Sequence, residues 1–136
     1  VTTMATQIFV NLAVKDLPKS KAFFSALGYS FNLQFTNDDA ACMVISDTIY
    51  TMLLTEPFFK GFTSKELVDA KKSTEAIVCL SAESRAAVDE IVSKAVAAGG
   101  RIYNEPQDHG FMYCHGFEDL DGHQWEFAYM DPSHGQ

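Results

Sequence analysis

Glu126 is the residue whose surroundings most clearly suggest chemistry. It lies in the segment "FEDLDGHQWEF", residues 117–127, where a tight acidic turn closed by Gly122 precedes a strand rich in aromatic residues. A carboxylate in a mostly apolar strand needs a partner, which is a metal ion, a cation, a hydrogen-bonding ligand or water at an edge. The sequence therefore raises the question of which groups complete a site around Glu126.

Side chains that could join Glu126 lie close to it in the sequence. By strand alternation we expect Cys114 to face the same side as Glu126, and His115 to point toward the helix side or an edge. His123 lies in the turn and His109 in the preceding loop, where solvated or hydrogen-bonded histidines are expected. A carboxylate near Cys114 would raise the pKa of its thiol, which disfavours a nucleophilic role for that residue. The sequence also contains no nucleophile triad, phosphate-binding loop or dinucleotide fingerprint.

The elements that must position these residues repeat along the chain. In the first half, a strand at 8–14 precedes a helix near 18–27 and strands around 31–35, 41–45 and 49–54. From residue 76 the order recurs, with a strand, a helix near 85–98, and strands at 101–103, 111–117 and 124–130. Hydrophobic periodicity, helix caps and closing glycines support these assignments. The pattern predicts an α+β fold of two βαβββ modules in a single domain spanning residues 1–136, with module one at about 6–56 and module two at about 75–131.

The connector between the modules, at about residues 57–74, carries an unusual aromatic trio of Phe58, Phe59 and Phe62. Two interpretations stay open: the rings fill the end of the core, or they wall a pocket. Thr63 and Glu66 match a capping box, so we expect a short helix over 64–71.

Composition limits the partners of this domain. The 136 residues are 47% hydrophobic, which suffices for one well-buried domain, and the net charge of −8 argues against nucleic acid or an anionic membrane as a partner. No apolar run approaches the roughly 20 residues that span a bilayer. The N-terminus lacks the pattern of a signal peptide, and the three widely spaced cysteines are expected to be reduced. We therefore expect a cytoplasmic protein.

Two segments resemble signatures of the vicinal oxygen chelate superfamily, which includes glyoxalases, bleomycin resistance proteins and extradiol dioxygenases. "VNLAVKDLPKSKAFFSALGY", residues 10–29, resembles the opening strand and helix of its members, and "FEDLDGHQWEF" resembles their closing turn and strand. The likeness is to glyoxalase-related bacterial proteins. It implies that eight strands form a curved mixed sheet around a cavity, with the helices on the outer face, and it suggests a homodimer.

The resemblance also implies where metal-dependent members carry their inward ligands. These positions fall at Phe9, Met52, Ile77 and Glu126, of which only Glu126 offers a donor. Divalent metals in such sites take three or four side-chain donors, so no metal cofactor is expected. His109 and His115 remain as substitutes from which a divalent metal site could be rebuilt.

Three hypotheses for function follow. The first is a metal-free protein that binds a small apolar or aromatic ligand, in which Glu126 binds a cationic or hydroxyl group or acts as a base. The second is a divergent metal-dependent lyase, similar to lactoylglutathione lyase, or a dioxygenase. The third is an enzymatically silent structural dimer. For the first hypothesis, the expected ligand-lining residues are Phe9, Asn11, Met52, Phe58, Phe59, Ile77, Cys114 and Glu126.

Overall fold

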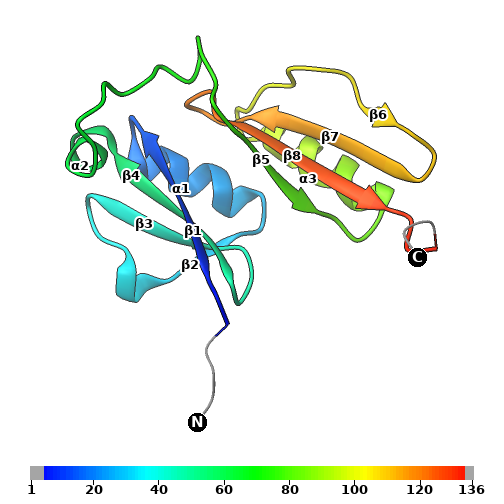
Figure 1. Ribbon diagram of the computed structural model, residues 1–136, viewed down its shortest axis with the longest axis horizontal. Coiled ribbons are helices and arrows are strands. Elements are labelled where there is room, and N and C mark those ends of the chain that lie inside the picture. The colour runs from blue at the N-terminus through cyan, green and yellow to red at the C-terminus, as the bar shows by residue number, and fades with distance from the viewer. Residues whose placement is uncertain (1–4, 134–136) are drawn as a thin grey trace. The chain divides into compact units, whose positions relative to one another are not determined.

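Two modules of the same design make up the chain. The computed structural model describes residues 5–133, and the chain divides into two compact units, Val1–Leu67 and Val68–Gln136. Each unit contains one four-stranded mixed sheet with a helix against one of its faces (Figure 1). The predicted α+β fold of two βαβββ modules is confirmed, with the eight strands divided between two sheets.

The first module has its sheet in the strand order β1-β4-β3-β2, in which β1 runs parallel to β4 and the other pairs are antiparallel. Asp16 caps the first helix by accepting a hydrogen bond from the Lys19 backbone N–H at 3.1 Å. Phe23 and Phe24 of that helix are buried. The elements are β1 (Ile8–Val14), α1 (Leu17–Ala26), β2 (Ser30–Phe31), the 3-10 helix η1 (Leu33–Phe35), β3 (Ala40–Val44), β4 (Ile49–Thr55) and α2 (Glu56–Lys60).

The second module repeats this topology in the order β5-β8-β7-β6, with β5 parallel to β8. Ser84 caps its helix through a hydrogen bond from the Ala87 backbone N–H at 3.0 Å. Val88 and Val92 on that helix are buried, and the helix packs on β7 and β8. The elements are β5 (Ile77–Ser81), α3 (Arg85–Ala97), β6 (Gln107–Asp108), β7 (Met112–Glu118) and β8 (Gln124–Met130).

The predicted helix over residues 64–71 is wrong. The Thr63 hydroxyl accepts a hydrogen bond from the Lys65 backbone N–H at 3.1 Å, which makes a local turn instead of a capping box with Glu66. Val68 is exposed and Leu67 is only partly covered, so the segment has no packed apolar face to stabilise a helix. The helix of this region lies earlier, at α2, where Pro57 occupies the first turn.

Two predicted strands are shorter or displaced. The strand expected around 31–35 ends at Phe31, because the Asn32 side chain accepts a hydrogen bond from the Gln34 backbone N–H at 3.0 Å and begins η1. The strand expected at 101–103 is reduced to one bridge between Arg101 and Glu118. The short strand that lies beside β7 is β6.

The turn between β7 and β8 is held by a buried carboxylate. Asp119 accepts hydrogen bonds from the backbone N–H groups of Asp121 and His123 and from Nε1 of Trp125, each at 3.0 Å. Burial raises the pKa of the Asp119 carboxyl, while nearby His123 opposes this shift. Gly122 completes the turn with φ of +90°, which side chains disfavour. This network fixes the start of β8 and directs the Trp125 ring to the helix side of the sheet.

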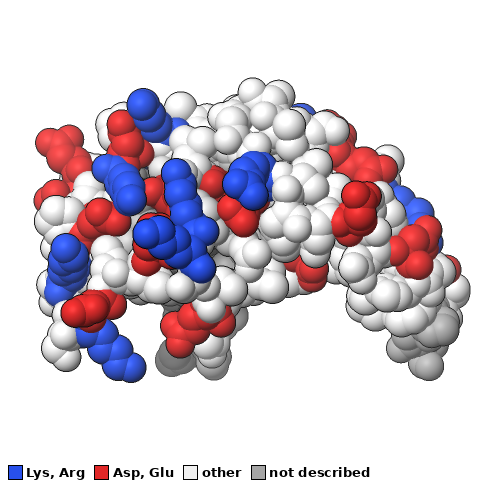
Figure 2. Space-filling view, turned by 90° about the horizontal axis from the view of Figure 1, so that it is seen from above, with Lys and Arg blue, Asp and Glu red and all other residues white. Residues whose placement is uncertain are grey.

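The charged side chains at the surface and the apolar character of the helices both agree with the expectations drawn from the composition. On the face drawn in Figure 2, Lys and Arg side chains lie among Asp and Glu side chains and form no continuous basic surface. Within residues 5–133, no helix has both the length and the apolar character needed to cross a membrane.

The Asp119 network predicts a large loss of stability on truncation. Asp119→Ala should lower the free energy of unfolding by about 2–4 kcal/mol, because the buried indole N–H and two backbone N–H groups lose their acceptor. Asp121→Ala, in the same turn but less buried, is the matched control and should cost less than about 1 kcal/mol. Urea unfolding followed by fluorescence measures both, since Trp125 is the one tryptophan of the sequence. Equal losses for the two variants would contradict the anchoring role of Asp119.

Candidate functional site

Glu126 lies on the side of the second sheet opposite to its buried aromatic residues. Across the sheet, Glu126 pairs with Cys79 of β5 on one side and with Gly116 of β7 on the other. Its chain neighbours Trp125 and Phe127 are buried, since alternation along the strand sends them to the side covered by α3. We call the side that carries Cys79, Cys114 and Glu126 the Glu126 face.

The Glu126 face is much more open than the helix side. Trp125 on the helix side has no exposed surface. On the Glu126 face, Ile77 is 51% exposed and Met130 is 53% exposed. Glu126 itself is half-buried among its strand neighbours. Two large and exposed apolar side chains therefore lie on the same face of the sheet as the Glu126 carboxylate.

The residue directly opposite Glu126 is Cys79. Cys79 is exposed, but the protein groups around its thiol displace part of its water. This desolvation, a hydrogen bond donated by the thiol to Glu126 and the charge of that carboxylate raise the pKa of the Cys79 thiol to about 11. Burial and the same carboxylate also raise the pKa of the Cys114 thiol. Both thiols are therefore protonated at neutral pH, which makes them weak hydrogen-bond donors and poor nucleophiles.

A backbone carbonyl next to Glu126 is turned toward the Glu126 face. Gly116 pairs with Glu126, so a side chain at position 116 would lie on the Glu126 face. A Cβ atom added to Gly116 would meet the carbonyl oxygen of Trp125. Tyr103 donates a hydrogen bond to the same oxygen at 3.3 Å. Burial and the charge of Glu126 raise the pKa of the Tyr103 phenol, so the hydroxyl stays protonated and able to donate. The glycine at 116 is what allows the carbonyl to occupy this position.

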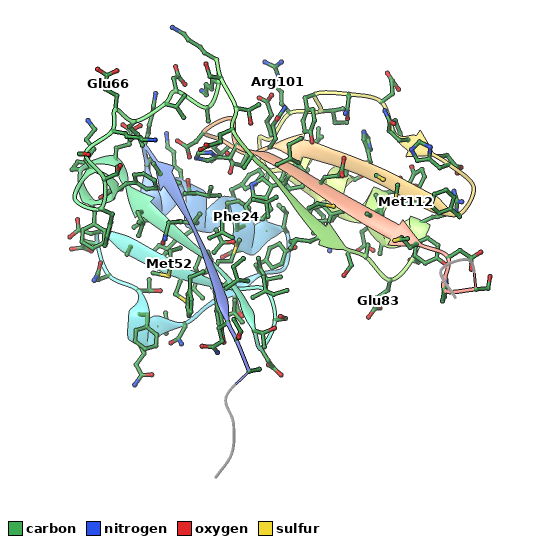
Figure 3. All side chains as sticks on the ribbon, viewed as in Figure 1. Phe24, Met52, Glu66, Glu83, Arg101 and Met112 are labelled. Atoms are coloured by element: carbon green, nitrogen blue, oxygen red, sulfur yellow. The ribbon has the colours of Figure 1, made fainter. Side chains whose placement is uncertain are left out.

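The predicted lining residues of the first module share one side of its sheet. Phe9 pairs with Tyr50 and Asn11 with Met52 in the β1–β4 register. The Phe9 and Tyr50 rings stack with centroids 4.8 Å apart and an interplanar angle of 10°. Met52 lies on β4 near the middle of this sheet (Figure 3). These residues are in the first unit, while Ile77, Cys114 and Glu126 share the corresponding side of the sheet in the second.

The aromatic trio of the connector is not buried in a core. Phe58 is 40% exposed and Phe62 is 70% exposed. The interpretation that these two rings fill the end of the core is therefore wrong. Their rings contact each other edge to face, with centroids 5.3 Å apart, and Phe59 is half-buried on α2. A polar hollow beside this helix is lined by Glu56, Lys60, Glu66 and Leu67.

The two histidines expected as substitute metal ligands, His109 and His115, do not lie beside Glu126 in the register of the second sheet. His115 pairs with Phe127 on the helix side of the sheet and places Nε2 3.1 Å from the Asn104 carbonyl oxygen. His109 is exposed in the β6–β7 hairpin, which Arg85 ties to α3 by an ion pair with Asp108 at 2.7 Å. Within residues 5–133, no three His, Cys, Asp or Glu side chains gather where they could hold a metal ion. The donor set around Glu126, one carboxylate beside protonated thiols, does not fit a divalent cation.

Sequence reasoning missed two members of the Glu126 face. Cys79 lies two residues beyond Ile77 on the same strand, so strand alternation alone places both on one face. The parallel register that sets Cys79 opposite Glu126 cannot be read from the sequence. Tyr103 was expected to lie in a strand, and its hydrogen bond to the Trp125 carbonyl comes from the loop that replaces that strand.

Comparison with known proteins places this geometry in a family. The model of the Glyoxalase/Bleomycin resistance protein/Dioxygenase superfamily matches residues 6–127. No curated protein matches the chain.

Solved structures with the same fold include the hypothetical protein SA1046 from S. aureus, with 29% identity, a TM-score of 0.77, and coverage of 93% of this chain and 95% of that one. A glyoxalase-related enzyme from Fulvimarina pelagi has 16% identity and a TM-score of 0.78, covering 93% and 88%. The fosfomycin resistance protein FosX from Listeria monocytogenes has 19% identity and a TM-score of 0.66, covering 93% and 92%. The match of the family model over most of the sequence shows that the chain belongs to the Glyoxalase/Bleomycin resistance protein/Dioxygenase superfamily.

Proposed function

We propose that this chain is a small-molecule binding protein of the glyoxalase/bleomycin resistance type that works without a metal. Its ligand is a small apolar or aromatic molecule, held on the Glu126 face of the second module. The observation that carries the proposal is the placement of Glu126, which projects from β8 onto an open sheet face between Cys79 and Gly116.

The chemistry of the Glu126 face favours binding over metal-assisted catalysis. Metal-dependent lyases and dioxygenases use the metal as a Lewis acid, which requires a set of donors. Of the four positions that the family resemblance implies, Phe9, Met52 and Ile77 are apolar. The neighbouring Cys79 is held in its protonated form, and a thiol must lose its proton to bind a metal. Exposed apolar side chains on the same face as the Glu126 carboxylate suit an organic ligand with one polar end.

The proposal includes a homodimer. Leu33 and Phe35 on η1 are among the most exposed large apolar side chains of the described residues, and Ile8 of β1 is also exposed. Exposed apolar side chains of this size are covered in many proteins by a second subunit. Sedimentation velocity at micromolar concentration should give the mass of a dimer. A single species at the monomer mass of 15.1 kDa would reject this part of the proposal.

A neutral aromatic alcohol provides the test of binding. Naphthylmethanol, which has an apolar body and an uncharged hydroxyl group, should bind at high micromolar to millimolar concentration. In a ¹⁵N-labelled sample, the amide signals of β5, β7 and β8 around Cys79, Gly116 and Glu126 should shift on titration. The physical reason is that exposed apolar surface next to a hydrogen-bond acceptor is buried by the probe.

A bulky side chain on the Glu126 face supplies the control. Cys79→Phe should fill the space beside Glu126 and abolish these shifts, while Cys42→Ser in the first module should leave them unchanged. The proposal fails if saturating probe shifts no signals of the second sheet, as the silent structural dimer predicts. It also fails if the shifts lie only around α2 and the hollow lined by Glu56 and Lys60.

A further inference from the structure

We infer that the ligand of the Glu126 face is an amine that binds in its protonated form, with its ammonium group on Glu126. This inference rests on the proposed function and names the class of ligand for the same face. It follows from the two acceptors at the centre of the face, whose neighbouring donors are all neutral, from the charge of the module, and from the apolar side chains on the same face.

Two hydrogen-bond acceptors lie at the centre of the Glu126 face. The Glu126 carboxylate stands there, and the Trp125 carbonyl oxygen is turned to the same side at Gly116. An ammonium group has three N–H donors and can bond to both oxygens, provided that Tyr103 yields its long hydrogen bond of 3.3 Å to the carbonyl. A carboxylate–ammonium contact is charge-assisted and is therefore stronger than a contact between neutral groups.

The donors already present leave the negative charge of Glu126 uncompensated. Cys79 donates to Glu126 as a neutral thiol and brings no positive charge. The strand positions that face this side on β5, β7 and β8 include no Lys or Arg within the described residues. Arg101, whose backbone bridges Glu118 at the end of the sheet, is exposed, and among residues 5–133 no ion pair joins it to Glu126. A half-buried carboxylate in this setting is completed by a cation from outside the chain.

The second module carries most of the negative charge of the protein. Residues 68–136 contain 12 Asp and Glu against 5 Lys and Arg, a net of −7, while residues 1–67 contain 6 against 5, a net of −1. The field of such a module attracts a cationic ligand and repels an anionic one. The charge and the local acceptors therefore select the same class of ligand.

The apolar neighbours specify the rest of the molecule. Ile77 lies on the same face, two residues before Cys79, and is half exposed. Met112 and Met130, which pair with each other in the β7–β8 register, lie on this face beyond Ala128. A methionine surface adapts to aromatic and aliphatic shapes. The ligand class is accordingly an aromatic or aliphatic amine with its charged nitrogen at one end.

Three probes that share one aromatic body test this inference. They are naphthylmethylamine, naphthylmethanol and naphthoate, which at neutral pH are a cation, a neutral alcohol and an anion. Dissociation constants come from the same amide shifts in the second sheet. The amine should bind at least about tenfold more tightly than the alcohol, and the anion should bind more weakly than both.

Two variants test whether the preference for the amine over the alcohol depends on the Glu126 carboxylate. Glu126→Gln keeps the shape of the side chain and should reduce the affinity of the amine about tenfold, while the affinity of the alcohol changes by less than about threefold. Glu118 pairs with Gln124 in the β7–β8 register and therefore lies on the same face. Glu118→Gln removes this second carboxylate and should leave the ratio of amine to alcohol affinity unchanged. The amide spectrum of each variant confirms that it is folded.

The outcomes separate this inference from the proposed function. If the alcohol binds at the second sheet but the amine binds no better, or if the anion binds best, the inference is overturned and the binding function stands. The inference is also overturned if the amine preference survives in Glu126→Gln. If none of the three probes shifts the second sheet, both the inference and the proposed function are overturned.

Discussion

The burial of Trp125 is the constraint on which the geometry of the site depends. Its indole ring has no exposed surface, and its Nε1 donates to the buried Asp119 carboxylate. Because side chains alternate along a strand, fixing Trp125 on the helix side sends Glu126 to the other side. A one-residue slip of β8 would bury the carboxylate and expose the indole, so the Asp119 turn stabilises the register as well as the turn.

The fold was largely predictable because its signals are local. Strand alternation in residues 124–130, the Asp16 and Ser84 caps, and the glycines that end the helices each depend on neighbours in the sequence. The expectation that Cys114 and Glu126 share a face is confirmed by the register, since Cys114 pairs with Ala128. The connector was harder, because a capping pattern at Thr63 does not make a helix when no apolar face packs against the protein.

The candidate site was predictable only in part, because it depends on pairing between distant strands. The sequence identified Glu126, but the parallel register that places Cys79 opposite it is set by how β5 docks on β8. The role of Gly116 was equally hidden, since its small size matters only because the Trp125 carbonyl approaches it. Neither the proposed binding function nor the proposed amine class of the ligand follows from family membership, because the same fold carries many chemistries. Both proposals rest on the groups around Glu126.

The Glu126 carboxylate lies on an open sheet face opposite the Cys79 thiol, and the ionisation of that thiol reports how the carboxylate acts on its neighbours. Cys79 is exposed, while Cys42 and Cys114 are buried, so alkylation by iodoacetamide with peptide mapping isolates its thiol. With a pKa of about 11, Cys79 should react at mildly alkaline pH about one hundredfold more slowly than an unstructured cysteine. Glu126→Gln should speed this reaction, because removing the carboxylate lowers the pKa, whereas Glu118→Gln should change it little. A Cys79 thiol that reacts like an unstructured cysteine, or a rate unaffected by Glu126→Gln, would contradict the account.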